Sequence, residues 1–212
     1  MDTLHHVCTD IYSINDPRSV QKRLCYAVED FCRRYKFPIP SHDALSISRT
    51  ETGKPYFPLS PQLQFSISHS GEYWSCALAN QTVGYDLQKY EQPKNESPQE
   101  MNLRHQKMAA RFFHPVETQF ILLDCQHNFF TVWCAREAYV KHTGQGIDQY
   151  FSEHCVIPNN KDDMYRISGK TSEISWSSMG KFFWKTYYGD DYTICICTDT
   201  PCNYTLISLC DS

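Results

Sequence analysis

The segment FSISHSGEYWSCALANQTVGYDLQ, residues 65–88, carries the clearest strand pattern in the chain. Apolar and polar residues alternate in FSISHS and again in TVGYDLQ, while YWSCALA between them is apolar and β-prone. Alternation with a period of two residues is typical of half-buried strands. Tight turns at residues 70–72 and 80–81 separate the three runs, so the segment predicts three antiparallel strands.

Upstream of this segment, the pattern predicts a helix and a turn. In VQKRLCYAVEDFCRRY, residues 20–35, apolar side chains recur at helical spacing, and Pro38 and Pro40 end the pattern. In ETGKPYF, residues 51–57, Gly53 can take a positive φ and Pro55 forbids a helix. The N-terminal part therefore runs helix, turn and strands.

Downstream, a polar segment precedes three helices and a strand-rich end. KYEQPKNESPQEMN, residues 89–102, has two prolines and little to bury, so it predicts a linker. Apolar periodicity and stop signals predict helices over residues 103–113, 114–124 and 128–143. Strands are predicted at residues 153–157, 164–168, 174–178, 182–188 and 192–198.

The two parts share an order of elements, because each runs helix and then hairpin. We therefore predict an α/β (α+β) fold made of a pseudo-twofold pair of similar subdomains, each a small antiparallel sheet packed with helices. The subdomains are predicted at residues 1–92 and 93–212, with a ligand cleft between them. An internal repeat of this kind makes a monomer sufficient.

Composition excludes several classes of protein. The 212 residues carry a formal net charge of -4, from 20 Lys and Arg against 24 Asp and Glu, so there is no general basic field for nucleic acid. No stretch approaches the roughly 20 apolar residues of a membrane-spanning helix, and the first residues lack a signal-peptide pattern. Eleven cysteines without a C-x-x-C pair suggest reduced packing residues. We expect a soluble, cytoplasmic protein that binds neither nucleic acid nor membranes.

Two carboxylates stand out, one in each part of the chain. In VGYDLQ, the period of two places Gly84, Asp86 and Gln88 on one face of a strand. On the helix over residues 128–143, Glu137 and Lys141 lie one turn apart. Asp86 and Glu137 together are a minimal anchor for a hard divalent cation. The alternatives are a solvated strand end for Asp86 and a surface ion pair between Glu137 and Lys141.

Two further residues are open to more than one interpretation. His69 follows Phe65 and Ile67 on one strand face, where a lone histidine is more often a satisfied structural group. Lys54 lies between Gly53 and Pro55, so it is either a positioned cation or a solvated loop lysine.

The order of the motifs is more specific than any one residue. GKPYF, FSISHSG, VGYDLQ, FF-x-x-x-E and W-x-x-x-E-x-x-x-K-x-x-G-x-G follow one another from about Thr52 to Ile147. In this order they resemble the surfactin-type 4′-phosphopantetheinyl transferases. The later strands fit the family fold without diagnostic residues.

The resemblance implies a Mg²⁺-dependent enzyme. It would move the phosphopantetheine arm of coenzyme A onto a serine of an acyl or peptidyl carrier protein and release adenosine 3′,5′-bisphosphate. Such carriers serve fatty acid synthesis or secondary metabolite biosynthesis, and the motifs do not select among them.

The resemblance also implies roles for individual residues by motif position. Asp86 and Glu137 match metal ligands, and Glu117 matches a further acidic position near the metal. Glu137 and Lys141 would be catalytic, the first accepting the serine proton and the second balancing the leaving group. The implied contacts to the coenzyme A phosphates are Lys54, Ser68, His69 and Lys141.

This chain departs from the family pattern at three places. One of them, Ala135-Arg136-Glu137 where Ser-Lys-Glu or similar is common, keeps the charge. Gln88 stands where a second acid is usual, and we predict that its neutral oxygen serves as a third metal ligand, directly or through water. The basic residues that clamp the 3′-phosphate have no clear match, and Arg18, Lys22 and Arg23 are stand-in candidates.

These departures leave other possibilities open. One is a catalytically weakened relative that binds coenzyme A or a carrier protein without transfer. In that case Gln88, in place of an acid, would indicate that the metal chemistry has been lost. A cysteine hydrolase using Cys134 and His142 is disfavoured, because eight residues of helix separate them by about 12 Å. Tyr73, Trp74 and Phe112 are either core residues or contacts for a carrier helix.

Overall fold

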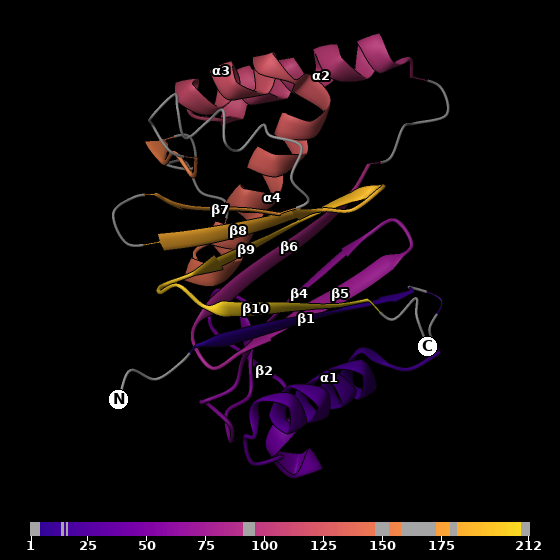
Figure 1. Ribbon diagram of the computed structural model, residues 1–212, viewed down its shortest axis with the longest axis vertical. Helices are drawn as coiled ribbons and strands as arrows, with labels where there is room; N and C mark the ends of the chain where they lie inside the picture. The colour runs from indigo at the N-terminus through magenta and orange to yellow at the C-terminus, as the bar shows by residue number, and fades with distance from the viewer. Residues whose placement is uncertain are drawn as a thin grey trace.

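The computed structural model describes residues 5–13, 15, 17–90, 96–146, 153–157, 173–178 and 182–208. Figure 1 shows two sheets stacked in the middle of the molecule, with helix α1 (Val20–Tyr35) below them and three helices above. The lower sheet has the strand order β10-β1-β5-β4 and the upper sheet the order β6-β9-β8-β7. This is the predicted α+β architecture of small sheets packed with helices.

The bounds of the elements follow the predicted segments closely in the middle of the chain. The lower sheet contains β1 (His6–Ser13), β4 (Gln64–Ser70), β5 (Tyr73–Ala79) and β10 (Asn203–Ser208). The upper sheet contains β6 (Val83–Lys89), β7 (Glu173–Ser178), β8 (Phe182–Tyr188) and β9 (Tyr192–Thr198). The remaining elements are a 3-10 turn at His42–Leu45, the short hairpin of β2 (Ser48–Arg49) and β3 (Pro55–Tyr56), and the helices α2 (Pro98–Phe112), α3 (Pro115–Leu123) and α4 (Cys125–Thr143).

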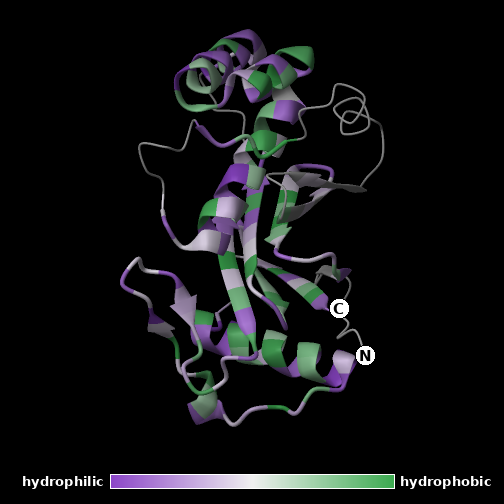
Figure 2. Cartoon of the chain, turned by 90° about the vertical axis from the view of Figure 1, so that its left-hand side faces the viewer, coloured by the Kyte–Doolittle hydropathy of each residue, from purple (hydrophilic) through white to green (hydrophobic). Residues whose placement is uncertain are grey.

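Apolar side chains fill the space between successive layers. In Figure 2 hydrophobic and polar residues alternate along the strands and around the helices. Val83, Tyr85 and Leu87 of β6 are buried between the two sheets, beside Ala77 of β5 and Ile194 of β9. The period of two in VGYDLQ therefore sends these residues into the inter-sheet core and leaves Gly84, Asp86 and Gln88 for the opposite face, as predicted.

Two strands pair with strands of the other predicted subdomain. β6 precedes residue 92 but pairs with β9, and β10, near the C-terminus, pairs with β1 in parallel. The sheets therefore exchange strands, and the subdomain boundary at residue 92 stays a prediction. Neither β1 nor β10 was predicted. β1 is buried on both faces, so it lacks the polar and apolar alternation that reveals a strand.

Two predictions about the chain after β6 are wrong. The predicted linker contains the first turn of α2, because Ser97 and Glu100 form a reciprocal capping box and Pro98 occupies the first helical position. Residues 153–157 form no strand. The strand predicted at residues 164–168 lies outside the described residues. None of the helices in the described ranges combines the length and apolar character that crossing a membrane requires.

Candidate active site

Asp86 is the centre of a buried polar cluster. Only 2% of Asp86 is exposed, and its carboxylate oxygen Oδ1 lies 2.6 Å from the Lys141 ammonium. The Ser68 hydroxyl donates a hydrogen bond to the same oxygen at 2.7 Å. The Gln88 amide nitrogen donates to Oδ2 at 3.0 Å. Four residues singled out from the sequence thus meet in space, from β4, β6 and α4.

The close approach of α4 to β6 brings Lys141 to Asp86. Gly84 makes this approach possible, because a Cβ atom there would lie 1.8 Å from the carbonyl oxygen of Ala138 and 2.5 Å from the amide of His142. No side chain fits between strand and helix at this point. Asp86, two residues further along the same face, therefore points at the last turns of α4.

A row of serines joins β4 to β6 in place of a backbone ladder. The Ser66 hydroxyl accepts a hydrogen bond from the Tyr85 amide at 3.1 Å, and the Ser70 hydroxyl accepts one from the Lys89 amide at 3.1 Å. Ser68 lies between them and turns toward Asp86. Because Ser68 is buried in this row, its side chain orients Asp86, which the motif match to a coenzyme A contact did not anticipate.

Glu137 lies one helical turn before Lys141, but Lys141 pairs with Asp86. The surface ion pair considered from the sequence is therefore not the arrangement found. Burial raises the pKa of Glu137, and the negative charge of Asp86 raises it further, while Lys141 lowers it. Two carboxylates close enough to raise a pKa in this way are a favourable place for a cation.

The donor set fits a magnesium ion. Mg²⁺ prefers oxygen ligands and commonly uses one or two carboxylates together with water and substrate phosphate oxygens, and Asp86 and Glu137 supply such carboxylates. The Lys141 ammonium already places one positive charge beside Asp86. Gln88 directs its amide nitrogen to Asp86 and accepts a hydrogen bond from the Ser70 hydroxyl at 3.4 Å. Its amide would have to turn over before its oxygen faced an ion held by Asp86.

A cavity of about 430 Å³ opens beside this cluster. Cationic and imidazole side chains from both predicted subdomains line it: Arg49, Lys54, His69 and Lys141. His69 is exposed to this cavity. Such a concentration of donors favours a polyanionic ligand.

Arg49 was missed by the sequence reasoning. It pairs with Pro55 across the short hairpin of β2 and β3, which places it opposite the GKP turn, and its guanidinium donates to the carbonyl of Gly53 at 2.9 Å. The turn at Gly53 was the available signal, because a hairpin brings the residue before the turn alongside the residue after it.

Lys54 is held at the C-terminal end of α4. Its ammonium donates to the carbonyl oxygen of His142 at 2.5 Å, where the helix presents unpaired carbonyls and partial negative charge. Burial lowers the pKa of Lys54, while the charge of Asp199 raises it. Lys54 is therefore a positioned cation and not a solvated loop lysine.

Glu117 belongs to a separate structural cluster. Its buried carboxylate accepts hydrogen bonds from the Arg136 guanidinium, with the Arg136 Nε at 2.7 Å, and from the amides of Val156 at 2.8 Å and His114 at 3.0 Å. These contacts tie α3 to α4 and to the 153–157 segment. Glu117 is engaged in stabilising the fold, and the position near the metal that its motif implied stays a prediction.

The three candidates for the 3′-phosphate clamp have different surroundings. The Arg18 guanidinium lies 5.2 Å from each of the Tyr12 and Tyr26 rings, and Lys22 lines a different groove along α1. Arg23 is buried, and its guanidinium lies 4.6 Å from the ring of Trp74, which itself lines the cavity. Of the three, Arg23 is the one next to the cavity.

The remaining candidates from the sequence are aromatic residues and cysteines. Trp74 is buried in the core of the lower sheet, while Phe112 on α2 is 45% exposed. Cys134 is fully buried, and burial raises the pKa of its thiol well above the usual value, which argues against a nucleophile. Cys195 and Cys197 pack in the core above the upper sheet.

Comparison with known proteins assigns this architecture to a family. The model of the 4′-phosphopantetheinyl transferase superfamily matches residues 82–197, which is more than half of the chain and includes Asp86, Glu137 and Lys141. The chain belongs to this superfamily.

Curated relatives agree with the family assignment. The chain is 29% identical over 164 residues to a 4′-phosphopantetheinyl transferase of Bacillus subtilis, covering 74% of this chain and 64% of the relative. It is 27% identical over 172 residues to 4′-phosphopantetheinyl transferase Sfp of Bacillus subtilis strain 168, covering 77% and 69%. It is 31% identical over 113 residues to 4′-phosphopantetheinyl transferase gsp of Aneurinibacillus migulanus, covering 51% and 42%. The chain thus spans between about two fifths and two thirds of the length of these relatives.

Proposed function

We propose that this protein is a 4′-phosphopantetheinyl transferase that moves the phosphopantetheine arm of coenzyme A onto a serine of a carrier protein. The observation that carries the proposal is the cluster of Ser68, Asp86 and Lys141, which opens onto a cavity lined by Arg49 and Lys54. Asp86 and Lys141 lie within the residues that the family model matches, and the relatives described above are named 4′-phosphopantetheinyl transferases. A carboxylate that can hold a cation, next to a site for a polyanion, suits the transfer of a phosphoryl-linked group, because cations stabilise the charge that develops.

In this proposal the cations of the cavity bind the phosphates of coenzyme A. Lys54 and His69 would contact these phosphates in the ground state, and Arg49 would make a third contact. Arg23, with its Nε and one terminal nitrogen buried and without a hydrogen bond, is the candidate for the 3′-phosphate. Each of these contacts exists before the reaction begins, so they contribute mainly to substrate affinity.

Asp86 and Glu137 would hold a magnesium ion, which supplies positive charge to the pyrophosphate oxygens. Gln88 stands beside them as the further proposed ligand. The Ser68 hydroxyl fixes the orientation of the Asp86 carboxylate and would keep this role after the Gln88 amide turned over toward the ion. This fixed geometry reduces the reorganisation needed during the reaction.

The chemical step forms one bond and breaks one. The carrier serine oxygen bonds to the β-phosphorus of coenzyme A, and the bond from that phosphorus to the oxygen of adenosine 3′,5′-bisphosphate breaks. Glu137 accepts the serine proton, a role that its raised pKa favours. Lys141 stabilises the charge that develops on the departing bisphosphate. The ligand role and the base role of Glu137 compete, and they predict different pH profiles.

The α2 face is the proposed docking surface for the carrier. Leu103 is 51% exposed and Phe112 45%, and together with Arg104, Lys107 and Arg111 they line a groove of about 340 Å³. An apolar groove edged with cations suits a helix that carries apolar and acidic side chains. We take the partner to be an acyl or peptidyl carrier protein.

The test is to incubate the purified chain with coenzyme A, Mg²⁺ and an unmodified carrier protein and to measure the carrier mass. A gain equal to the phosphopantetheine group supports the proposal, provided that a carrier with its serine replaced by alanine gains nothing. Tight coenzyme A binding without a mass gain, across a panel of carriers, would instead support a weakened relative that binds without transfer.

A further inference from the structure

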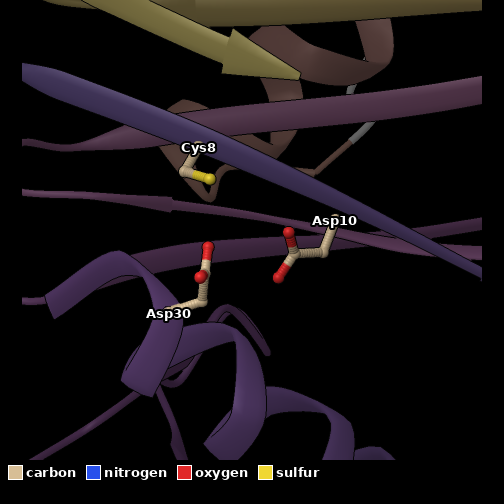
Figure 3. Close-up of side chains that lie close together, drawn as sticks. All are labelled: Cys8, Asp10 and Asp30. Carbon is tan, nitrogen blue, oxygen red and sulfur yellow. The ribbon is translucent and has the colours of Figure 1, made fainter. Parts of the chain in front are cut away.

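A second group of metal-ligating side chains lies below the lower sheet, away from Asp86. Cys8 and Asp10 occupy alternate positions of β1 and so share the face that α1 covers. Asp30 projects from α1 toward them. The Cys8 sulfur and one carboxylate oxygen from each aspartate lie within 4.8 Å of one another. Figure 3 shows the three side chains converging on one space between the strand and the helix.

The Cys8 thiol is an observation independent of the two carboxylates. It is 2% exposed, points toward the carboxylates, and has no hydrogen-bond partner among the described residues. Cys8 is also part of the hydrophobic core below the lower sheet, and within that core its sulfur lies beside the two carboxylates. Its position between two acids is that of a ligand.

The charges of the cluster are also incompletely balanced. Arg34 donates to Oδ2 of Asp30, with its Nη2 at 3.1 Å and its Nε at 3.4 Å. Asp10 is only 5% exposed and has no ion pair in the described part of the chain. Two carboxylates thus share this space with the sulfur, and the one ion pair that they form with described residues joins Asp30 to Arg34.

We propose that Cys8, Asp10 and Asp30 bind one divalent transition-metal ion of the zinc class. One sulfur and two carboxylate oxygens are ligands that Zn²⁺ accepts, whereas Mg²⁺ and Ca²⁺ avoid thiolates. The Asp30 side chain is 46% exposed, which leaves the ion a path from solvent and room for a water ligand. This site is distinct from the proposed magnesium site, because it lies on the opposite face of the lower sheet from the inter-sheet core.

Binding changes the protonation of the cluster. The S–H bond of Cys8 breaks, a metal–sulfur bond forms, and the proton leaves to solvent. Burial and the nearby carboxylate of Asp10 raise the pKa of the Cys8 thiol well above its usual range, so the free protein keeps the thiol protonated. Metal affinity is expected to increase with pH, because a thiol must lose its proton before it ligates a metal. The bound ion would tie α1 to a central strand of the lower sheet.

The test uses Co²⁺ as a spectroscopic substitute for Zn²⁺ on the full chain, after removal of metals with a chelator. We expect a thiolate-to-cobalt absorption band in the near ultraviolet that saturates at one equivalent and disappears when Zn²⁺ is added. Cys8→Ser should abolish the band. Cys32→Ser should keep it, because Cys32 is buried on α1 but lies outside the cluster.

A second pair of variants covers the possibility that Cys8→Ser fails to fold. Asp30→Asn should weaken Co²⁺ binding by at least about tenfold, the lower limit for losing even an indirect contact to a metal. Glu29→Gln is the matched control, since Glu29 pairs with Arg33 on α1 as Asp30 pairs with Arg34, and it should change nothing. No band in the wild-type protein, a band that survives Cys8→Ser, or equal effects of Asp30→Asn and Glu29→Gln would overturn the proposal.

Discussion

Gly84→Ala is the substitution with the most direct structural consequence for the proposed active site. The new Cβ atom would lie 1.8 Å from the Ala138 carbonyl oxygen, whereas real Cβ atoms essentially never come closer than 3.0 Å to such an atom. Backbone atoms of α4 cannot turn aside, so the helix must move away from β6 by about 1.2 Å or more. That movement would stretch the 2.6 Å contact between Lys141 and Asp86 beyond hydrogen-bonding distance.

The expected magnitudes follow from this displacement. Overpacking should lower the free energy of unfolding by about 1–3 kcal/mol. A misplacement of about 1 Å at the reacting groups should lower kcat by about 100-fold. Denaturant unfolding monitored by circular dichroism measures the first effect, and the rate of carrier modification at saturating coenzyme A measures the second.

Gly189→Ala is the matched control for this substitution. A Cβ atom at Gly189 would meet the ring of Tyr192 at 2.5 Å, and this ring is the far end of the side chain of the first residue of β9, so it can move. We expect a small loss of stability and an unchanged kcat. If Gly84→Ala kept both the wild-type kcat and the wild-type unfolding free energy, the reasoning that Gly84 sets the distance between α4 and β6 would be refuted.

Three further predictions concern the charges of the site and of the core. Asp86→Asn should abolish transfer and leave the circular dichroism spectrum unchanged, because it removes the negative charge that holds Lys141 and would hold a metal. Near-normal turnover at saturating Mg²⁺ would contradict the metal assignment. Gln88→Glu adds a carboxylate beside Asp86, so the Mg²⁺ concentration for half-maximal transfer should fall, and an identical midpoint would place residue 88 outside the reach of the metal. Burial lowers the pKa of His105 to about 4, while the unfolded chain titrates near 6.5. The unfolded state therefore binds a proton first as the pH falls, and the unfolding free energy should drop between about pH 6.5 and pH 4 by up to about 3 kcal/mol. His105→Phe should flatten this slope, and an unchanged slope would assign it to other groups.

Local periodicity in the sequence was sufficient to predict most of the elements and the direction of their side chains. The alternation in VGYDLQ predicts which residues of β6 face the inter-sheet core, because successive side chains of a strand point to opposite faces whatever the strand packs against. Helical spacing predicts α1 to the residue and places Glu137 and Lys141 on one face of α4. The same logic failed for β1, since a strand buried on both faces shows no alternation.

The sequence by itself therefore determined most of the elements, the faces of Asp86, Glu137 and Lys141, and, through the order of its motifs, the family. Only the tertiary structure decided that Lys141 pairs with Asp86 instead of Glu137, and that Ser68 turns to the same carboxylate. It also decided that Cys8 and Asp10 meet Asp30 beneath the lower sheet. The physical reason is that the periods of a strand and of a helix are local properties of the backbone. The partner that a side chain meets depends instead on how distant segments pack. Here that packing depends on single contacts, such as the close approach of α4 to β6 that the missing Cβ of Gly84 allows.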